Sequence, residues 1–336
     1  MVNSERYSRQ TVLDNIGEGG QKKLSMSRVT VVGLGALGSV IVTLLGRAGV
    51  GHLRLIDRDI VELVNLHRQI LYEEADVGMP KALRAVDKIR KINSDIEVEG
   101  VAKDMNYANA IDLLDGSQLI MDGTDNLETR FLINEACLEL DVPWIYGGAI
   151  GVEGRVMTIV PGKTACFQCF TRNIPAPGAL PTCEITGILN SVASATASFQ
   201  VTEAIKLLLG EKTTGDLFVL DGWSPELIRM KIKRREDCPA CIKKEKEFLG
   251  GKKPQAIAAL CGQNTISFDP LRKGDIDLPV LSERLSKVGK VRTSEPVILF
   301  EVDKYELTIF KDGRALIKGT NSEEVAKTLY SKYIGL

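Results

Sequence analysis

Two Cys-x-x-Cys pairs place the strongest constraint on how this chain can fold. Cys166 and Cys169 form the first pair, and Cys238 and Cys241 form the second. Two thiolates at this spacing can bind one metal ion from a tight turn, and four sulfur ligands are typical of a closed tetrahedral zinc site. The pairs are separated by the 68 residues from 170 to 237. Zinc would therefore hold together the two ends of a long segment instead of folding a small finger.

The composition limits the kind of protein that this chain can be. It has 336 residues, of which 44% are hydrophobic and 26% charged, with a net charge of −1. That balance is typical of a soluble globular protein, and we expect no membrane attachment and no nucleic-acid partner. The uncharged run from 29 to 46 is interrupted by glycines and predicts a strand, a turn and a helix, not a membrane span. Seven cysteines without a secretory signal predict a cytoplasmic protein whose paired thiols bind metal or do redox work.

The first 150 residues alternate between strand-like and helix-like runs. We expect strands at 28–33, 52–57, 97–103, 119–122 and 143–146, and helices at 36–48, 81–92 and 128–140. This alternation predicts an α/β fold with a Rossmann-like, doubly wound and mainly parallel sheet. Further strands at 155–160, 217–221 and 227–233 and a long helix at 188–209 lie around the two cysteine pairs. We therefore expect the sheet to continue into a zinc-stapled C-terminal part.

The end of the chain has a pattern of its own. Residues 1–245 form the predicted larger domain, and the charged, glycine-containing residues 246–257 predict a linker. Residues 258–336 then predict strands at 265–269 and 314–318, a hairpin at 297–310 and helices at 278–288 and 322–333. We interpret residues 258–336 as a small α+β domain, to which the sequence assigns no role.

A glycine motif follows the first predicted strand. Gly33, Gly35 and Gly38 stand between that strand and a helix. Glycines here let the backbone approach a phosphate, and the amino end of a helix favours negative charge. Asp57, at the end of the next strand, would bond the hydroxyls of a ribose. These residues predict a nucleotide site but leave NAD and ATP open, and packing alone is a further explanation of the glycines.

A second group of polar residues favours ATP. Asp59, Asn65, Arg68 and Gln69 precede Lys81, which starts a predicted helix. Arg68 and Lys81 would reach the same end of the sheet as the glycines, where two extra cations fit a triphosphate better than a dinucleotide. Solvated surface charges are the alternative explanation, because most isolated charges are of that kind.

Two more positions are candidates for chemistry. Asp125 and Asn126 follow a buried strand, at the edge where open α/β sheets bind ligands. Asp125 could hold Mg²⁺, which prefers oxygen ligands, or could cap the next helix with help from Asn126. Cys183 precedes the long helix, where a thiol becomes a better nucleophile, although it could equally be an idle cytosolic thiol.

Together these motifs resemble those of a known protein family. The segments RYSRQ, VVGLGALGS, DRD, NLHRQ, VGMPK, DGTDN, PTCE and the paired cysteines occur in the order of a known family. Residues 5–245 resemble the ubiquitin-activating-enzyme-like adenylyltransferases of the ThiF/MoeB type, which activate sulfur-carrier proteins in thiamine and molybdopterin synthesis. His67 departs from the glutamine that several members carry.

The resemblance implies a homodimer with cofactors at two sites. ATP and Mg²⁺ would be bound by Gly33, Gly35, Gly38, Asp57, Asp59, Asn65, Arg68, Gln69, Lys81, Asp125 and Asn126. Arg9 would reach the phosphates of the partner subunit, and Cys166, Cys169, Cys238 and Cys241 would bind zinc. The resemblance assigns catalysis to Arg9, Arg68, Lys81, Asp125 and, in some members, Cys183.

The implied reaction joins two anions. The C-terminal glycine carboxylate of a ubiquitin-like carrier ending in Gly-Gly would attack the α-phosphate of ATP and give an acyl adenylate and pyrophosphate. This nucleophile is already ionised at pH 7, so charge neutralisation matters more than a base. The alternatives are an ATP-dependent tRNA-nucleoside dehydratase of the same superfamily, an NAD-dependent dehydrogenase and a non-catalytic scaffold.

Overall fold

The computed structural model describes residues 5–172, 186–224, 226–251, 259–260, 265–268, 276–294 and 296–334. The chain divides into two compact units, Met1–Lys253 and Pro254–Leu336, and each is described by itself. Within the described ranges, none of the helices combines the length and the apolar character that a membrane span requires.

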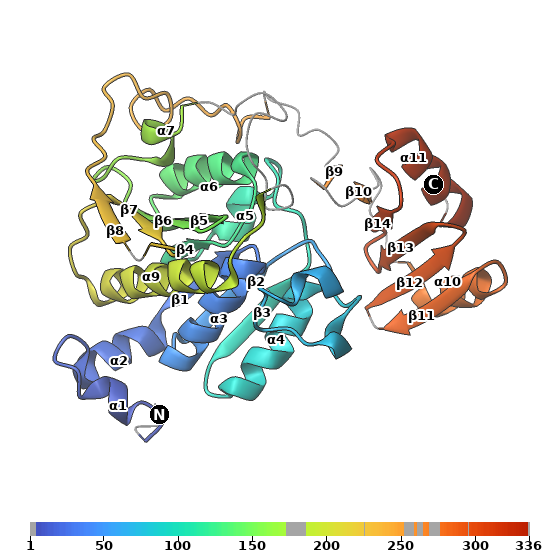
Figure 1. Cartoon of the computed structure of the whole chain (residues 1–336), viewed down its shortest axis with the longest axis horizontal. Helices are drawn as coiled ribbons and strands as arrows, with labels where there is room; N and C mark the ends of the chain where they lie inside the picture. Colours follow the sequence, from blue (N-terminus) through green and yellow to red (C-terminus); the bar gives the residue numbers. More distant parts are fainter. Residues whose placement is uncertain are drawn as a thin grey trace. The chain divides into compact units, whose positions relative to one another are not determined.

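The larger unit is built on one twisted sheet with the strand order β3-β2-β1-β4-β5-β6-β7-β8 (Figure 1). Its parallel strands are β1 (Arg28–Val32), β2 (His52–Ile56), β3 (Glu97–Val101), β4 (Leu119–Asp122) and β5 (Trp144–Ile150). Its antiparallel strands are β6 (Glu153–Ile159), β7 (Leu217–Asp221) and β8 (Glu226–Met230). The predicted α/β fold with a mainly parallel sheet is confirmed.

Helices cover both faces of this sheet because its strands are apolar on both sides. Val31 packs on the face covered by α3 (Ala36–Ala48), α4 (Lys81–Ile92) and α9 (Asn190–Leu209). Val32, the next residue, packs on the face covered by α5 (Ala110–Leu114), α6 (Leu127–Leu140) and α7 (Phe167–Phe170). The remaining short helices are α1 (Ser8–Thr11), α2 (Gly17–Met26), η1 (Leu63–Asn65) and η2 (Glu74–Asp76). This is the doubly wound arrangement, in which the loops after the parallel strands gather at one edge.

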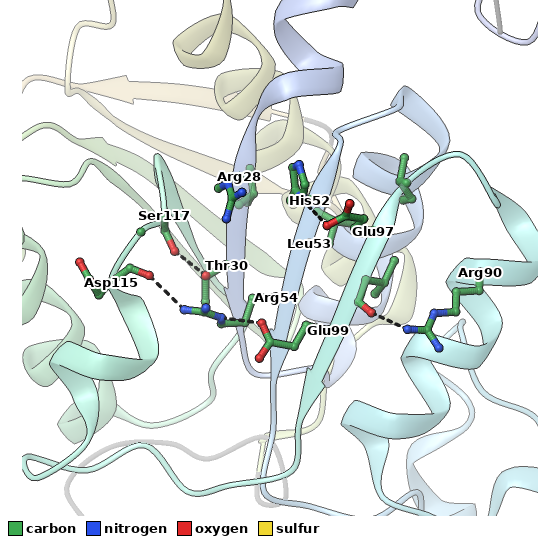
Figure 2. Close-up of a pocket in the computed structure, with 14 residues that line it drawn as sticks. Arg28, Thr30, His52, Leu53, Arg54, Arg90, Glu97, Glu99, Asp115 and Ser117 are labelled. Atoms are coloured by element: carbon green, nitrogen blue, oxygen red, sulfur yellow. Dashed lines mark hydrogen bonds and ion pairs between the residues drawn. The ribbon is translucent and has the colours of Figure 1, made fainter. Parts of the chain in front are cut away.

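Polar side chains also lie at the opposite edge of the sheet, at the amino-terminal ends of β1, β2 and β3. These side chains line a cavity of about 470 Å³ (Figure 2). His52 pairs with Glu97 at 2.9 Å and Arg54 pairs with Glu99 at 3.0 Å, each across neighbouring strands. Because the strands are parallel, this cavity lies at the other end of the sheet from the glycine motif.

The smaller unit is an antiparallel sheet with two helices on one face. Its strand order is β11-β12-β13-β14-β10-β9. The strands are β9 (Ala259–Leu260), β10 (Thr265–Phe268), β11 (Lys290–Ser294), β12 (Val297–Val302), β13 (Tyr305–Phe310) and β14 (Ala315–Lys318). Helices α10 (Leu278–Ser286) and α11 (Glu323–Tyr333) pack against Ile298, Phe300 and Leu307. This is the predicted α+β module.

The first described residues of the predicted linker are packed on the larger unit. Phe248 stacks on Phe131 of α6, with 4.7 Å between ring centroids. Glu135, also on α6, accepts hydrogen bonds from the backbone N–H groups of Phe248 and Leu249 at 2.9 and 2.8 Å. Residues 246–251 therefore extend the part of the larger unit that carries the paired cysteines along α6.

Candidate functional site

The glycine loop joins the end of β1 to the start of α3 and lies against the loop that follows β4. Gly33 has a φ of 85°, and a Cβ built on it would stand 2.7 Å from the carbonyl carbon of Gly123. A Cβ on Gly38 would stand 1.9 Å from the carbonyl oxygen of Gly33. Gly33 and Gly38 are therefore required by packing. Gly35 differs, because its nearest neighbour would be Gln69 Nε2 at 3.7 Å, which leaves room above the loop.

Asp57 directly follows β2 and is held by backbone amides. Its Oδ2 accepts from the N–H of Leu34 in the glycine loop at 2.6 Å, and its Oδ1 accepts from the N–H of Asp59 at 2.7 Å. Burial raises the pKa of Asp57 to about 6, although the charge of Lys81 opposes the rise. Asp57 therefore fixes the glycine loop while it remains close to protonation at neutral pH.

Lys81 is a buried cation at the amino end of α4. It is only 4% exposed, and its Nζ donates to Asp59 Oδ2 at 3.3 Å. Burial lowers the pKa of Lys81, but the carboxylates of Asp59, Asp57 and Asp125 together raise it above its ordinary value. Burial also raises the pKa of Asp59, but Lys81 and Arg58 lower it below its ordinary value. Lys81 and Asp59 are consequently charged at neutral pH.

Asn65, Arg68 and Gln69 lie on one short segment that begins in η1. Asn65 Oδ1 accepts from Arg68 Nη2 at 2.7 Å, and Arg68 Nη1 lies 2.9 Å from Nε2 of the neighbouring His67. Gln69 is buried, and its Oε1 has no hydrogen-bond partner within the part of the chain that the structure describes. An orphaned acceptor beside Gly35 is the kind of atom that a bound ligand or water would satisfy.

Arg130 on α6 was not predicted from the sequence, yet it holds the ends of two strands together. Its Nε donates to Asp122 Oδ2 at 3.0 Å, and its Nη2 donates to the carbonyls of Thr124 at 2.6 Å and Gly147 at 2.9 Å. Burial lowers the pKa of Arg130, but Asp122 raises it above its ordinary value. The spacing between Arg130 and the N-cap of α6 could have predicted this role. Arg130 follows the cap by one helical turn, and its side chain therefore points back toward β4.

Asp125 and Asn126 have separate roles in the structure. Asn126 is the N-cap of α6, and its side chain accepts from the N–H of Thr129 at 2.8 Å. Asp125 is exposed, and its charge raises the pKa of Lys81 and Arg130. The capping alternative therefore belongs to Asn126, and the Asp125 carboxylate acts on the cations around the strand ends.

Two predicted catalytic residues are not brought to this edge by the described chain. Arg9 is exposed on α1, which is attached through Gln10 to the carbonyl of Ala48, the last residue of α3, at 2.9 Å. The glycine loop is at the other end of α3, and 13 residues of helix span about 20 Å. Cys183 lies outside the described residues.

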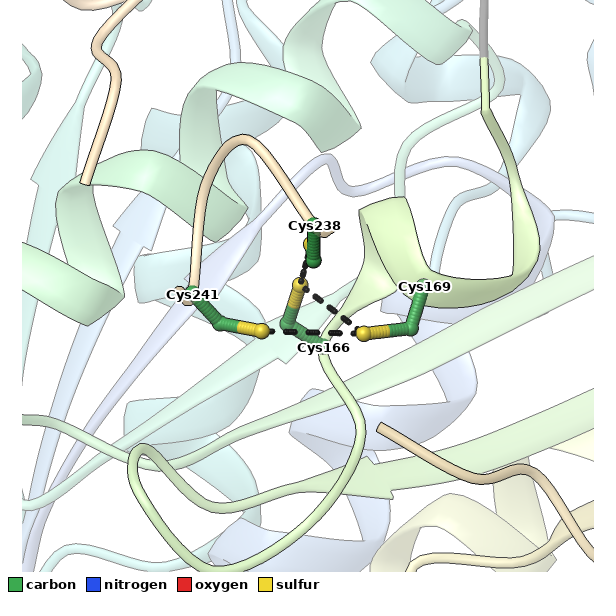
Figure 3. Close-up of side chains that lie close together, drawn as sticks. All are labelled: Cys166, Cys169, Cys238 and Cys241. Carbon is green, nitrogen blue, oxygen red and sulfur yellow. Dashed lines mark hydrogen bonds between the residues drawn. The ribbon is translucent and has the colours of Figure 1, made fainter. Parts of the chain in front are cut away.

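The four paired cysteines meet in a compact cluster (Figure 3). Sγ of Cys166 lies 3.8 Å from Cys169 and 3.6 Å from Cys238, and Sγ of Cys169 lies 3.6 Å from Cys241. Sulfur atoms at about 2.3 Å from one tetrahedral zinc ion would be separated by roughly 3.8 Å. The cluster therefore has the donor set and the dimensions of a structural zinc centre.

The fold and these two sites define an α/β protein with a candidate nucleotide edge and a centre of four cysteines. The sequence profile described as the ThiF family matches residues 7–240. Since this match covers well over half of the chain, the protein belongs to the ThiF family.

Individual relatives agree with this assignment. The chain is 39% identical to a sulfur carrier protein ThiS adenylyltransferase of Bacillus subtilis over 335 residues, which is 98% of this chain and 99% of that protein. It is 37% identical to a SAMP-activating enzyme E1 of Haloferax volcanii over 239 residues, or 70% of this chain and 88% of that protein. The similarity to the Bacillus protein thus includes the smaller unit.

A solved structure shows the same fold. The crystal structure of Escherichia coli MccB with ATP has a TM-score of 0.61 and 24% identity to this chain, and the match covers 71% of this chain and 75% of MccB.

Proposed function

We propose that this protein adenylates the C-terminal glycine carboxylate of a ubiquitin-like sulfur-carrier protein and releases pyrophosphate. The observation that carries the proposal is the buried, charged Lys81 beside the glycine loop, at the edge of the sheet where ligands bind. Similarity to the ThiS adenylyltransferase over almost the whole chain supports the class of substrate.

In this proposal the nucleotide lies along the glycine loop. Backbone N–H groups at the start of α3 would face its phosphates, and Asp57 would bond its ribose. Asn65, Arg68, Gln69 and Lys81 would contact the triphosphate, with Gln69 donating through Nε2, the atom that lies nearest to Gly35. The orphaned Oε1 of Gln69 would accept from a donor such as a ribose hydroxyl or a bound water. Asp59 fixes the position of Lys81, because its Oδ2 accepts a hydrogen bond from Lys81 Nζ at 3.3 Å.

The reaction needs two anions to meet, and the residues fit that requirement. The carrier carboxylate needs no base, because it is ionised at neutral pH. Lys81 and Arg68 would offset the charge of the phosphates, and their positions are fixed before the substrates bind. Asp125 would hold Mg²⁺, which would supply further positive charge to the phosphates.

The proposed site is completed by a second copy of the chain. Within one chain Arg9 is about the length of α3 away from the glycine loop, so we propose that Arg9 of the partner subunit reaches the phosphates. Val12 and Leu13 beside Arg9 are 71% and 53% exposed, and Leu63 and Val64 near Arg68 are 66% and 69% exposed. Exposed apolar side chains on both segments fit a subunit contact.

The four-cysteine centre is proposed to bind structural zinc. Sulfur distances of 3.6 to 3.8 Å and four soft donors fit this ion. The centre would fix α7 and the segment after β8, which leaves catalysis to the edge of the sheet. Cys183 remains a candidate for later thioester, disulfide or persulfide chemistry.

The carrier is proposed to approach from the side of β5 and β8. Its C-terminal tail would lie near Asp125 and Gly147–Gly148. The hairpin of β7 and β8 exposes Trp223 by 76%, Leu227 by 50% and Ile228 by 51%. Large exposed apolar side chains on an edge strand and on the turn before it favour contact with a folded protein partner.

Exchange of labelled pyrophosphate into ATP tests the function. We expect exchange that depends on a purified carrier ending in Gly-Gly and that disappears with the same carrier lacking its last glycine. Exchange that depends on tRNA instead would favour the dehydratase, and an absence of exchange with every carrier would reject the proposal.

A further inference from the structure

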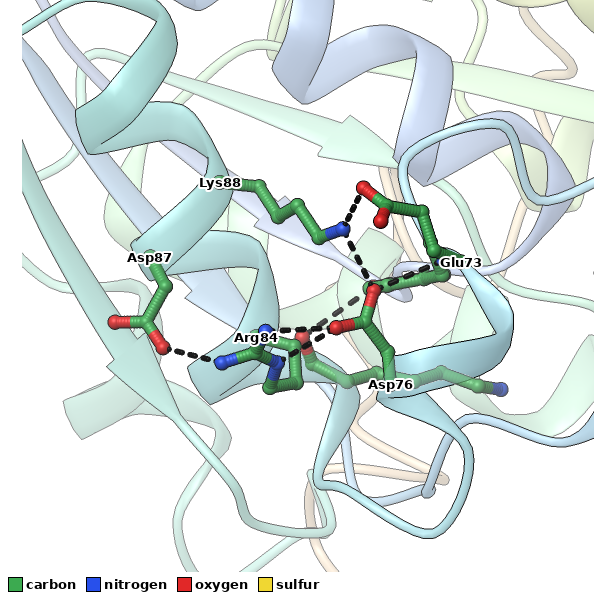
Figure 4. Close-up of polar contacts among 7 residues, drawn as sticks. Glu73, Asp76, Arg84, Asp87 and Lys88 are labelled. Atoms are coloured by element: carbon green, nitrogen blue, oxygen red, sulfur yellow. Dashed lines mark hydrogen bonds and ion pairs between the residues drawn. The ribbon is translucent and has the colours of Figure 1, made fainter.

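Another buried carboxylate lies beside the helix that Lys81 begins and has no place in the chemistry described so far. Asp76 ends η2, and its side chain is only 1% exposed (Figure 4). Its Oδ1 accepts from Arg84 Nε at 2.9 Å and Nη2 at 2.7 Å, and its Oδ2 accepts from Lys88 Nζ at 2.8 Å. Asp76 therefore binds two cations at once, with little water around it.

Both cations belong to α4. Arg84 and Lys88 stand four residues apart, so they lie on one face of the helix. Burial raises the pKa of Asp76, but the hydrogen bond from Lys88 and the other contacts lower it below its ordinary value, so that Asp76 is ionised at neutral pH. The N–H of Glu73 also donates to Asp76 Oδ2 at 2.9 Å. The loop that leads into α4 is thus attached to the side of the same helix.

This attachment is continuous with the lysine that faces the nucleotide edge. Directly after Asp76, the N–H of Gly78 donates to the carbonyl of Val61 at 2.8 Å, and the N–H of Val61 donates to the carbonyl of Met79 at 2.8 Å. The N–H of Lys81 donates to the carbonyl of Asp59 at 2.9 Å. Residues 78–81 therefore lie along residues 59–61, and the segment between them, which carries Asn65, Arg68 and Gln69, is held at both ends.

Tyr72 joins the same segment to the glycine loop. Its hydroxyl lies 3.2 Å from the carbonyl oxygen of Leu34 and 3.3 Å from that of Lys81, and it can donate to either. A shift of residues 72–80 would therefore be passed to the glycine loop and to the start of α4.

We propose that Asp76 is a positioning residue for the nucleotide, which acts through Arg84 and Lys88 to fix residues 61–81 and thereby the cations Arg68 and Lys81. The proposal rests on the function proposed above. A buried ion pair is a poor source of stability, but its directional contacts can select one geometry. Asp76 touches no substrate, so its effect is on the arrangement of the residues that do.

The test uses the full chain with Asp76→Asn. We expect the KM for ATP in pyrophosphate exchange to rise about tenfold or more with a smaller change in kcat, because misplacement of binding groups by about 1 Å can cost up to a hundredfold. Asp216→Asn is the matched control, because Asp216 is also a buried carboxylate bound to an arginine, Arg229, at 2.6 Å, and it lies at β7. Asp216→Asn should leave the KM for ATP unchanged.

Substitutions of Lys88 keep the test decisive if Asp76→Asn does not fold. Lys88→Met should raise the KM for ATP in the same direction, and Lys88→Arg should restore it. A KM for ATP in Lys88→Met that equals that of the wild type would overturn the proposal, as would equal effects of Asp76→Asn and Asp216→Asn. Calorimetric titration with ATP alone separates the two proposals, because it reports on Asp76 even if no carrier supports exchange.

Discussion

The nucleotide edge and the four-cysteine centre belong to one unit but are built in opposite ways. At the edge, Asp57 has a pKa raised to about 6 by burial, and Gln69 keeps an acceptor without a partner in the described chain. At the centre, four sulfur atoms lie within 4.8 Å of one another and would all be satisfied by one ion. In the proposed function, the edge holds groups whose interactions would be completed by a ligand that binds and leaves, whereas the centre would be completed by a permanently bound ion.

The residues around the four-cysteine centre are packed more tightly than those around the nucleotide edge. Phe167, between the cysteines of the first pair, contacts the rings of Phe131, Tyr146 and Phe170 at 5.2, 5.2 and 5.1 Å between centroids. Such packing stabilises a fixed arrangement. The edge is bordered instead by exposed side chains such as Asp125. A substitution in the centre should therefore act on folding, and a substitution at the edge should act on catalysis.

The largest expected effect is at the centre. Cys169→Ser should lower the zinc content to a small fraction of one ion per chain and lower the free energy of unfolding by roughly 5 kcal/mol or more, because structural zinc contributes directly to folding. Metal analysis and thermal unfolding measure both. Cys137→Ser is the control, since Cys137 is equally buried but lies outside the cluster. Full zinc content with unchanged melting in Cys169→Ser would remove the structural role.

A substitution at the nucleotide edge should lower activity and leave stability nearly unchanged. Arg68→Ala should reduce carrier-dependent pyrophosphate exchange by about a hundred- to a thousandfold, which is typical for the loss of one group that offsets developing charge. The melting temperature should change little, because among the described residues Arg68 bonds only within its own segment. Arg54→Ala, at the far ends of the strands, is the matched control. Exchange at the wild-type rate in Arg68→Ala would break the comparison between the two regions.

Much of the fold could be predicted because its signals are local. Helices α3 and α4 begin and end at the predicted residues, since a glycine turn precedes α3 and a proline precedes α4. The short helices α1 and α2 were not predicted. α1 has no buried residue of its own and is held by neighbours that are distant in sequence, such as Ala48. Contacts of that kind leave no periodic pattern.

The site was predictable in its residue types but not in its connections. The sequence placed Asp57, Asp59 and Lys81 at one edge, because the carboxyl ends of parallel strands meet there. It could not show that Asp57 bonds the glycine loop, or that Arg130 joins β4 to β5. These contacts depend on which buried groups face each other after the chain has folded.

A further expected effect is a dependence of stability on pH. The pKa of Asp57 rises from 3.8 to about 6 on folding, so the folded protein holds its proton more tightly than the unfolded chain. The associated stability is complete below about pH 4 and is lost as the pH rises through about 6, by about 3 kcal/mol in total. Urea unfolding of the wild type and Asp57→Asn across this range should show the loss in the wild type alone.

Asp76 should give stability a pH dependence of the opposite sign to that of Asp57. Burial raises the pKa of Asp76, but the hydrogen bonds from Lys88, Glu73 and Arg84 together lower it below its ordinary value in the folded protein. Its contribution to stability is therefore present at neutral pH and is lost as the pH falls through the acid range. On acidification, the stability advantage of the wild type over Asp76→Asn should therefore shrink. Over the same range, the stability of the wild type relative to Asp57→Asn should increase. Parallel pH dependences would show that burial does not raise the pKa of Asp57 in the folded protein.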